Sequence, residues 1–506
     1  MTELLSTTEI KKRSIKGAKW LLVMNGLGMP AAFFIALMLG RIGPEALGVY
    51  ALVQILIGVI TTFVVYGGAP ILSVFLPKLS CAEERGRFFF SYAIILLGMM
   101  TLTLGLFWLF PTAFAFLLQR KFDMHNYGWF VLLAIVIVMS EALVNTASGL
   151  MLIKIAAISR QMVRLALLPL VAVLFLFKRE ILIDHGMVCI LGGFFFGYIV
   201  AAVICVVSII RDQRFQLRLG WLIPRGFWAF SFTTMAATMF SFLYGNIDRM
   251  AVLSLHNLEG LGMYQAVISI NVLVENISSI LLPSVIPTFS NLLGVNQHET
   301  FHRAFSLLCR WIVVPITLLS LVVMAFSWEI LAMFGLEYTK YAYLLTLFGL
   351  VGIIRSLRLP SFTILTCKEK NAFRFWQSFF MVFVQGLLTF AFMSHYGLIA
   401  IAGAKILCVS VSSVVGILYV VYGLGMARSL PLSYKAAVLA GITMTILRIW
   451  FVPVGWWSSV LLMLSCVLLF LAVSRFSMAE IRRVIRFIIH HDSAILVKDA
   501  ENDQRS

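Results

Sequence analysis

The chain has 506 residues, of which 61% are hydrophobic and 12% are charged, and its mean hydropathy is +1.00. Soluble domains carry about 25% charged residues, so the composition excludes a water-soluble protein and predicts an all-α polytopic membrane protein. The net charge of +17 would suit a nucleic-acid partner. However, Lys and Arg gather in short connectors at nearly every second gap between apolar runs, which is the positive-inside pattern. We therefore expect a lipid bilayer around this chain, and no nucleic acid.

Apolar runs that are long enough to cross a bilayer recur along the whole chain and predict about 14 transmembrane helices. They are expected near 18–40, 48–76, 88–110, 127–153, 161–178, 186–210, 227–250, 262–290, 304–327, 341–366, 373–394, 397–423, 434–454 and 456–474. The basic connectors alternate in a way that places both termini in the cytoplasm. The first span is too long for a removable signal peptide, and no small-residue cleavage site follows it.

The same motif follows the first and the seventh span. Residues 39–53 read LGRIGPEALGVYALV, and residues 253–267 read LSLHNLEGLGMYQAV. The shared positions include Glu45, Gly48 and Tyr50 in the first copy and Glu259, Gly262 and Tyr264 in the second. An even number of spans separates the copies, so the two lobes are expected to have the same orientation, as a parallel repeat around a central cavity.

This repeat predicts six-helix lobes, followed by two extra helices at the C-terminal end. The expected parts are a basic N-terminal segment, the N-lobe, a basic cytoplasmic linker, the C-lobe, spans 13 and 14, and a cytoplasmic amphipathic tail. Their boundaries are 1–17, 18–212, 213–226, 227–427, 428–475 and 476–506. The tail is expected on the inner leaflet, because apolar and basic residues occupy opposite faces of its helical pattern.

Turn and cap chemistry accounts for each position of the motif. The glycines let the chain leave a tight outer turn with close backbone packing. The glutamates lie near a helix start, where the dipole favours a carboxylate, and the tyrosines suit the membrane interface. The alternative is that Glu45 and Glu259 line the outer mouth of the cavity. A Gly193-x3-Gly197 pair in the sixth span also predicts close helix packing inside a lobe.

The motif resembles the start of the polysaccharide transporter, or O-antigen flippase, family of the multidrug/oligosaccharidyl-lipid/polysaccharide exporter superfamily. Members often show a Leu-Gly-Pro-Glu-like turn and a Gly-x-Tyr after the first span. The second half is similar too, with Asn246-Ile247-Asp248-Arg249 near the end of span 7 and Gly262-Met263-Tyr264 opening span 8. The resemblance extends over nearly the whole chain in length, span number and lobe arrangement.

Charged residues inside spans are the candidate functional residues, because a charge at mid-span is costly unless it faces a polar cavity or a partner. Arg355 and Arg358 are three residues apart in span 10 and are expected on one helix face. With Lys405 and Arg249 they are the candidate substrate-binding cations. Arginine binds phosphate oxygens in bidentate fashion, so this set suits a pyrophosphate.

The buried carboxylates are the candidates for ion coupling. They are Glu141 in span 4, Glu275 in span 8 and Asp248 near the outer end of span 7. A carboxylate at that depth either takes up a proton or binds a sodium ion. The alternative for all of these charges is an ion pair that holds helices together.

Metal and cofactor chemistry is not expected. His298-Glu299-Thr300-Phe301-His302 matches the zinc-protease pattern, but it falls in a connector without an evident third ligand. Phosphate-binding loops, dinucleotide-binding glycine sets and nucleophile motifs are not evident in the sequence, so ATP-driven transport by this chain alone is not expected. The expected protein is a membrane transporter and not an enzyme.

The resemblance implies a flippase that moves a polyprenyl-pyrophosphate-linked oligosaccharide across the bacterial inner membrane by alternating access. Its partners would be this lipid-linked substrate, the bilayer and other polysaccharide assembly proteins. One alternative is a cation-coupled multidrug exporter of the same superfamily. A second alternative is a membrane glycan polymerase or ligase, although such enzymes typically need a large outer loop.

Overall fold

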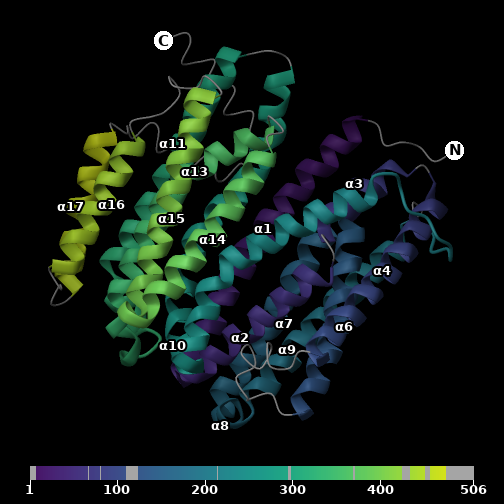
Figure 1. Ribbon diagram of the computed structural model, residues 1–506, viewed down its shortest axis with the longest axis horizontal. Helices are drawn as coiled ribbons and strands as arrows, with labels where there is room; N and C mark the ends of the chain where they lie inside the picture. Colours follow the sequence, from purple (N-terminus) through teal and green to yellow (C-terminus); the bar gives the residue numbers. More distant parts are fainter. Residues whose placement is uncertain are drawn as a thin grey trace. The chain divides into compact units, whose positions relative to one another are not determined.

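The computed structural model describes residues 7–65, 68–79, 81–109, 124–212, 215–294, 298–367, 371–423, 433–450 and 456–474. Every regular element in these ranges is a helix and none is a strand (Figure 1). Eleven helical segments of the described chain are long and apolar enough to cross a membrane. The expectation of an all-α polytopic membrane protein is confirmed. The expected C-terminal tail, 476–506, lies outside the described residues.

Three of the expected spans are helical without belonging to those eleven segments. The spans near 227–250 and 262–290 both fall within α10 (Phe227–Gly294), and the span near 434–454 corresponds to α16 (Ser433–Trp450). α10 is kinked at Asn257, whose φ is 63° and ψ is −171°. Two helices therefore meet at this residue, at the turn of the second motif copy.

The chain forms two compact units, Met1–Gln265 and Ala266–Ser506, which we call the first and the second unit. The first unit includes α10 up to Gln265, whereas the repeat assigns residues from 227 onward to the C-lobe. The lobe assignment rests on the repeat rather than on packing, and it stays a prediction. Before α10, the first unit contains α1 (Thr7–Ile42), α2 (Pro44–Phe63), α3 (Gly68–Phe75), α4 (Ala82–Leu109), α6 (Met124–Gly149), α7 (Ile153–Phe177), α8 (Arg179–Asp184) and α9 (Gly186–Ile210), with a short 3-10 turn, η1 (Leu76–Lys78).

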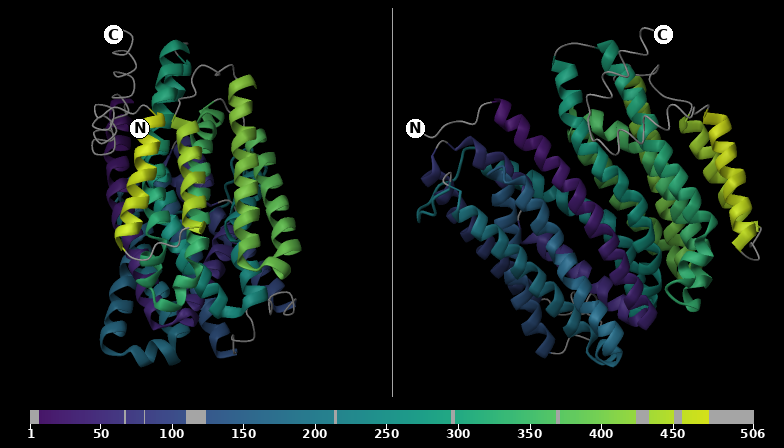
Figure 2. Two further views of the ribbon diagram at one scale, coloured as in Figure 1. Left: turned by 90° about the vertical axis from the view of Figure 1, so that its left-hand side faces the viewer. Right: turned by 180° about the vertical axis from the view of Figure 1, so that it is seen from behind.

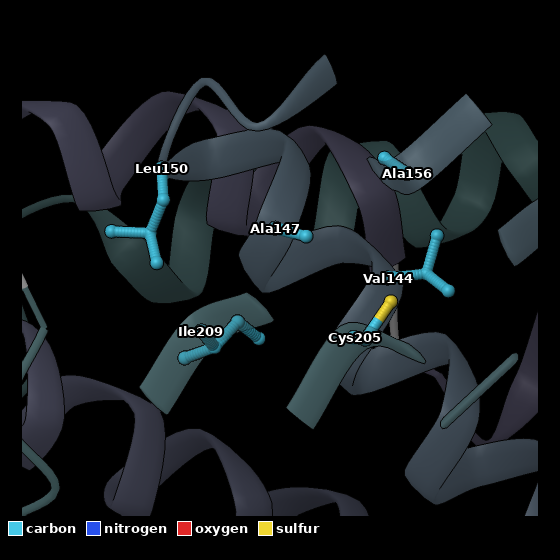
Figure 3. Packing of buried hydrophobic residues seen from close by; sticks show 6 residues of the cluster. All are labelled: Val144, Ala147, Leu150, Ala156, Cys205 and Ile209. Carbon is cyan, nitrogen blue, oxygen red and sulfur yellow. The ribbon is translucent and has the colours of Figure 1, made fainter. Parts of the chain in front are cut away.

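The core of the first unit lies where α7 packs between α1 and α9. Glycines on α9 allow this approach, because a side chain at Gly193 would collide with Leu167 and one at Gly197 would lie 2.8 Å from the Val163 Cα. The expected close packing of this glycine pair inside one lobe is thus confirmed. A small cluster of buried apolar residues packs α6, α7 and α9 together. Figure 3 shows its six residues, from α6, the following turn, α7 and α9: Val144, Ala147, Leu150, Ala156, Cys205 and Ile209.

The two motif copies touch each other inside the first unit. A Cβ on Gly48 would overlap the Leu258 carbonyl oxygen and lie 3.3 Å from the Gly262 nitrogen. A Cβ on Gly262 would overlap the Pro44 carbonyl oxygen and lie 2.9 Å from the Gly48 nitrogen. Pro44 and Leu258 occupy the same motif position, so each copy makes the same contact with the other. The glycines therefore serve a backbone contact between the two copies.

The tyrosines of the motif are buried inside the protein, so the expected interfacial contact of their rings with lipid and of their hydroxyls with water is wrong. Tyr50 is 2% exposed and stacks on Phe194 with ring centroids 6.1 Å apart. Tyr264 is fully buried, and its hydroxyl donates a hydrogen bond of 2.5 Å to the Asp248 carboxylate. Both rings are buried because the motif turns pack on other helices of the unit instead of ending in solvent.

The second unit is built around α13, which packs between α11 and α15 (Figure 1). After the end of α10 it contains α11 (His298–Ala325), α12 (Ser327–Ala332), a 3-10 segment η2 (Leu336–Tyr341), α13 (Ala342–Cys367), α14 (Asn371–Tyr396), α15 (Leu398–Leu418), a π-helical turn η3 (Tyr419–Gly423), α16 and α17 (Trp456–Ser474). The extra pair, α16 and α17, lie side by side in both views of Figure 2 and pack on α11. A buried contact fixes α16, since the Tyr434 hydroxyl donates to the Leu357 carbonyl of α13 at 3.1 Å.

Candidate functional site

Arg355 forms an ion pair inside the second unit. Its guanidinium group contacts the Glu275 carboxylate of α10, and the Asn271 side-chain amide donates to the same carboxylate at 3.0 Å. The two charged side chains are 33% and 16% exposed. The helix-locking interpretation therefore describes this pair, because Arg355 ties α13 to α10.

Arg358 contacts a different neighbour. It is 5% exposed, and its guanidinium group lies 2.9 Å from the Met381 sulfur and 2.9 Å from the Ser412 hydroxyl. The same group stacks on the Phe362 ring at 4.6 Å. Gln377 donates to the Ser412 hydroxyl and to its carbonyl at 2.7 Å. The two arginines of α13 thus turn toward different elements, Arg355 toward α10 and Arg358 toward α14 and α15.

An apolar groove of about 330 Å³ lies between α14 and α15, next to Arg358. Met381 and Ser412, which both contact the arginine, line this groove together with Gln377. The other lining residues are Phe373, Trp376, Phe380, Val384, Leu407, Cys408, Val411 and Val415. The arrangement places a cation directly behind an apolar surface, which suits a molecule that joins an apolar chain to an anionic group.

Lys405 is also buried in the second unit. It is 7% exposed, and its ammonium group lies over the Phe348 ring at 5.3 Å. Phe348 is on α13, two turns before Arg355, so Lys405 of α15 contacts the helix that bears Arg355 and Arg358.

Asp248 and Arg249 lie in the first unit. Asp248 is fully buried and accepts hydrogen bonds from the Tyr264 hydroxyl and from the Arg249 backbone at 2.9 Å. The Arg249 guanidinium donates to the Asn246 side-chain oxygen at 3.2 Å. The Asp248 carboxylate therefore fixes the second motif copy to the preceding helix.

Glu141 has a different environment on α6. Among the described residues, nothing donates a hydrogen bond to its carboxylate, and no cation forms an ion pair with it. Arg160 on α7 is the cation that acts on it electrostatically, and the Tyr92 and Tyr198 hydroxyls lie within the same range. Of the three candidate coupling carboxylates, Glu141 is the one without a hydrogen-bond donor in the described chain.

Two arginines of α7 had no expected role. α7 begins at Ile153, not near residue 161. Arg160 therefore lies with Arg164, which was already within the expected span, inside a helix that is long and apolar enough to cross a membrane. Both are exposed. Arg160 donates to the Asn145 side chain at 3.3 Å, and Arg164 donates to the Gln161 side chain at 3.5 Å. The signal that identifies them is the four-residue spacing of two cations within one apolar helix.

The motif glutamates are both exposed. Glu45 lies in the first turn of α2, directly after Pro44 at the first helical position. Glu259 follows the kink at Asn257 by two residues. Both placements fit the expected helix-start role, and the alternative of a cavity-mouth role stays open. Among the described residues, no group of three or more His, Cys, Asp or Glu side chains is arranged to hold a metal ion.

Comparison with known proteins adds a family and a fold. A family described as "Polysaccharide biosynthesis protein" matches residues 14–293, more than half of the chain. No curated protein sequence matches the chain.

Among solved structures, a multidrug resistance MATE family transporter of the MOP superfamily, in an inward-facing conformation, superimposes with a TM-score of 0.63 at 12% identity. The match covers 81% of this chain and 98% of that one. The lipid II flippase MurJ gives a TM-score of 0.61 at 14% identity over 90% and 97% of the two chains. A MOP superfamily transporter from Pyrococcus furiosus gives 0.56 at 11% identity over 82% and 96%. This multi-pass membrane protein therefore belongs to the polysaccharide biosynthesis protein family, and its fold is similar to that of these transporters.

Proposed function

We propose that this protein is a flippase that moves a polyprenyl-pyrophosphate-linked oligosaccharide, such as an O-antigen or exopolysaccharide repeat unit, across the bacterial inner membrane. Both termini would lie in the cytoplasm, as the basic connectors indicate. Transport would proceed by alternating access of the two repeats. The family supports a role in polysaccharide assembly, and other proteins of that assembly would be its partners.

The observation that carries this proposal is the position of Arg358 behind the apolar groove of α14 and α15. A lipid pyrophosphate has two chemically different parts, an apolar chain and a dianionic or more highly charged headgroup. The groove offers apolar and aromatic side chains to the chain, and Arg358 contacts two of the residues that line it. Arg355, Lys405 and Arg249 add cations on α13, α15 and α10 that a headgroup passing through the protein would meet.

Glu141 is the coupling carboxylate in this proposal. Its carboxylate lies near Arg160 without a donor among the described residues, so a bound proton or sodium ion would change the charge that Arg160 experiences. Glu275 and Asp248 already accept hydrogen bonds, from Asn271 and Tyr264, and they bind helices together instead. Glu141→Gln should remove ion-dependent transport while Glu141→Asp retains part of it. The measurement is transport into vesicles under imposed proton and sodium gradients.

The alternative of a multidrug exporter predicts carboxylates that are available to a drug cation. In the described residues, Glu275 is paired with Arg355 and Asp248 is hydrogen-bonded to Tyr264. Of the three candidate carboxylates, Glu141 is therefore the one available to a drug cation. The alternative of a polymerase or ligase predicts that cells with an inactive variant fail to polymerise or attach the glycan, although lipid-linked units still cross the membrane.

The decisive experiment replaces both arginines of α13 in cells that depend on this protein for surface glycan. Arg355→Ala plus Arg358→Ala should lower surface glycan by about tenfold or more, because each lost charge-assisted contact is worth about tenfold. Lipid-linked units should accumulate on the cytoplasmic side. Arg303→Ala is the matched control, since this half-buried arginine pairs with Glu299 of its own helix at 2.7 Å.

Normal glycan export by the double variant at normal protein levels contradicts the proposed cation site. Loss of glycan polymerisation in isolated membranes, without accumulation of lipid-linked units, favours the enzyme alternative. Drug sensitivity without any glycan defect favours the multidrug exporter.

A further inference from the structure

The exposed residues of α7 change in character along the helix. In its first half they include Arg160 and Arg164, which are four residues apart and therefore share one face. In its second half they include Val173, Leu176 and Phe177, which are 55%, 71% and 79% exposed and lie on a different side of the helix. The apolar side of the second half is suited to contact with lipid chains, whereas the side that bears the two arginines is not.

The two arginines lie deep along the helix axis. Arg160 is about 10 Å and Arg164 about 17 Å from Ile153, at about 1.5 Å per residue. Arg164 therefore lies near the midpoint of this 25-residue helix, which is long and apolar enough to cross the hydrocarbon core of a bilayer, about 30 Å thick. An exposed guanidinium at the midpoint of a spanning helix requires water or an anion beside it, because immersion in hydrocarbon costs at least several kcal/mol.

The local structure fixes both arginines with neutral groups. Asn145 on α6 accepts from Arg160, and Gln161 accepts from Arg164. Gln161 is itself 8% exposed, and it donates to the Asn25 side chain of α1 at 2.7 Å. Gly28 makes room for it, since a Cβ there would collide with the Gln161 amide. Amide partners orient a guanidinium without neutralising it, so the positive charge of the pair is retained.

Neither arginine forms an ion pair with a carboxylate in the described chain. Each guanidinium has five N–H donors in a planar fork, and one hydrogen bond is made by each. Arg164 and Arg249 both lie within electrostatic range of Tyr50, which places a third cation of the first unit in the same neighbourhood. The remaining donors of the pair match the oxygens of a phosphate or pyrophosphate.

We propose that Arg160 and Arg164 form an anion-binding site of the first unit that takes the pyrophosphate of the lipid-linked substrate. The site consists of residues of the first unit, and it rests on the proposed function for the identity of the substrate. Arg160 and Arg164 contact the phosphate oxygens, and Gln161 and Asn145 are positioning residues. Arg160 also connects this site to Glu141, the carboxylate proposed for coupling.

The test measures binding to the purified full-length protein in lipid nanodiscs. The probes are a radiolabelled short-chain isoprenyl pyrophosphate, the corresponding isoprenyl alcohol and inorganic pyrophosphate. Arg160→Ala and Arg164→Ala should each weaken binding of the isoprenyl pyrophosphate by about tenfold or more, and leave binding of the alcohol unchanged. Arg211→Ala is the control, since it removes another exposed cation of the same unit at the end of α9. Binding of inorganic pyrophosphate with the same sensitivity to the variants identifies a headgroup-only site.

Charge-retaining variants keep the test decisive if an alanine variant fails to fold. Arg160→Lys and Arg164→Lys preserve the charge but lose the bidentate fork, so binding should weaken by several-fold. For the positioning role, Gln161→Met should reduce the effect of a further Arg164→Ala, giving a non-additive double-mutant cycle. Additive losses contradict the role of Gln161.

Wild-type affinity of the folded arginine variants for the isoprenyl pyrophosphate overturns the proposal, and so does equal sensitivity of alcohol binding. Failure of the α7 anion site can be distinguished from failure of the proposed flippase function. If the variants lose binding but removal of the whole protein leaves glycan export intact, the anion site stands and the flippase proposal fails. If export requires the protein but proceeds normally in both arginine variants, the flippase proposal stands and the α7 site fails.

Discussion

The intramembrane cations of the two units differ in what surrounds them. In the second unit, Arg355 is paired with Glu275, and Arg358 is enclosed by Met381, Ser412 and Phe362. In the first unit, Arg160 and Arg164 are exposed and have amide partners. A cation enclosed by helices contributes to packing whatever else it does, whereas an exposed cation contributes little to stability. The difference predicts that stability and substrate binding respond to different arginines.

The largest effect is expected from the ion pair of the second unit. Glu275→Gln removes the charge opposite Arg355 and should lower the free energy of unfolding by about 2 kcal/mol, less than the roughly 3–5 kcal/mol of a fully buried pair, because this pair is only partly buried. Glu299→Gln is the matched control. Its pair with Arg303 is exposed, and such pairs are worth about 0–1 kcal/mol. Thermal unfolding of the purified protein in detergent measures both changes, and equal effects contradict a structural role for the buried pair.

A smaller effect should separate the two kinds of arginine directly. Arg358→Met removes the contacts to Ser412 and should cost about 1 to 2 kcal/mol, since the hydroxyl loses a charge-assisted donor. Arg164→Met should change stability by no more than about 0.5 kcal/mol, as exposed substitutions do. The same thermal measurement compares them, and pyrophosphate binding should show the reverse order for the first unit. If Arg164→Met is as destabilising as Arg358→Met, the exposed pair is structural.

The smallest effect on stability is expected where α1 contacts the Gln161 side chain. Gly26→Ala on α1 meets no atom within 4 Å and should stabilise the helix by about 0.5 to 1 kcal/mol. Gly28→Ala, one half-turn away, displaces the Gln161 amide, so it should not show this increase in stability. It should also weaken pyrophosphate binding by a few-fold, whereas Gly26→Ala leaves binding unchanged. Identical behaviour of the two variants in both measurements contradicts the positioning of Gln161 by this contact.

Apolar length and charge alternation were sufficient to predict the class of fold, because a spanning helix needs only hydrophobic length and satisfied backbone groups. The motif likewise located both turns, with Glu45 in the first turn of α2 and the kink of α10 at Asn257. The burial of Tyr50 and Tyr264 was not predictable in the same way. A turn at the end of an apolar run has the same local pattern whether it meets water or a second copy of itself.

The candidate site was harder to predict than the fold for two physical reasons. A three-residue spacing places Arg355 and Arg358 on one side of α13, but long side chains diverge to whichever partner is within reach. Glu275 and Ser412 are distant in sequence, so neither contact has a local signal. Arg160 was missed because α7 begins eight residues earlier than the hydropathy pattern indicated. Arg164 already lay inside the expected span 161–178, but it was not recognised as an intramembrane cation. Basic residues at the start of a helix raise its polarity and conceal its true beginning.

The reciprocal contact of Gly48 with Leu258 and Gly262 with Pro44 has the geometry of an isologous interface, in which one surface patch meets a copy of itself. In separate chains, such a patch is what joins two subunits across a two-fold axis. Here both copies belong to one polypeptide, so the contact has become internal and its stoichiometry is fixed by covalent linkage. One polypeptide thus contains, in two of its own turns, the kind of self-complementary contact that otherwise joins the subunits of a homodimer.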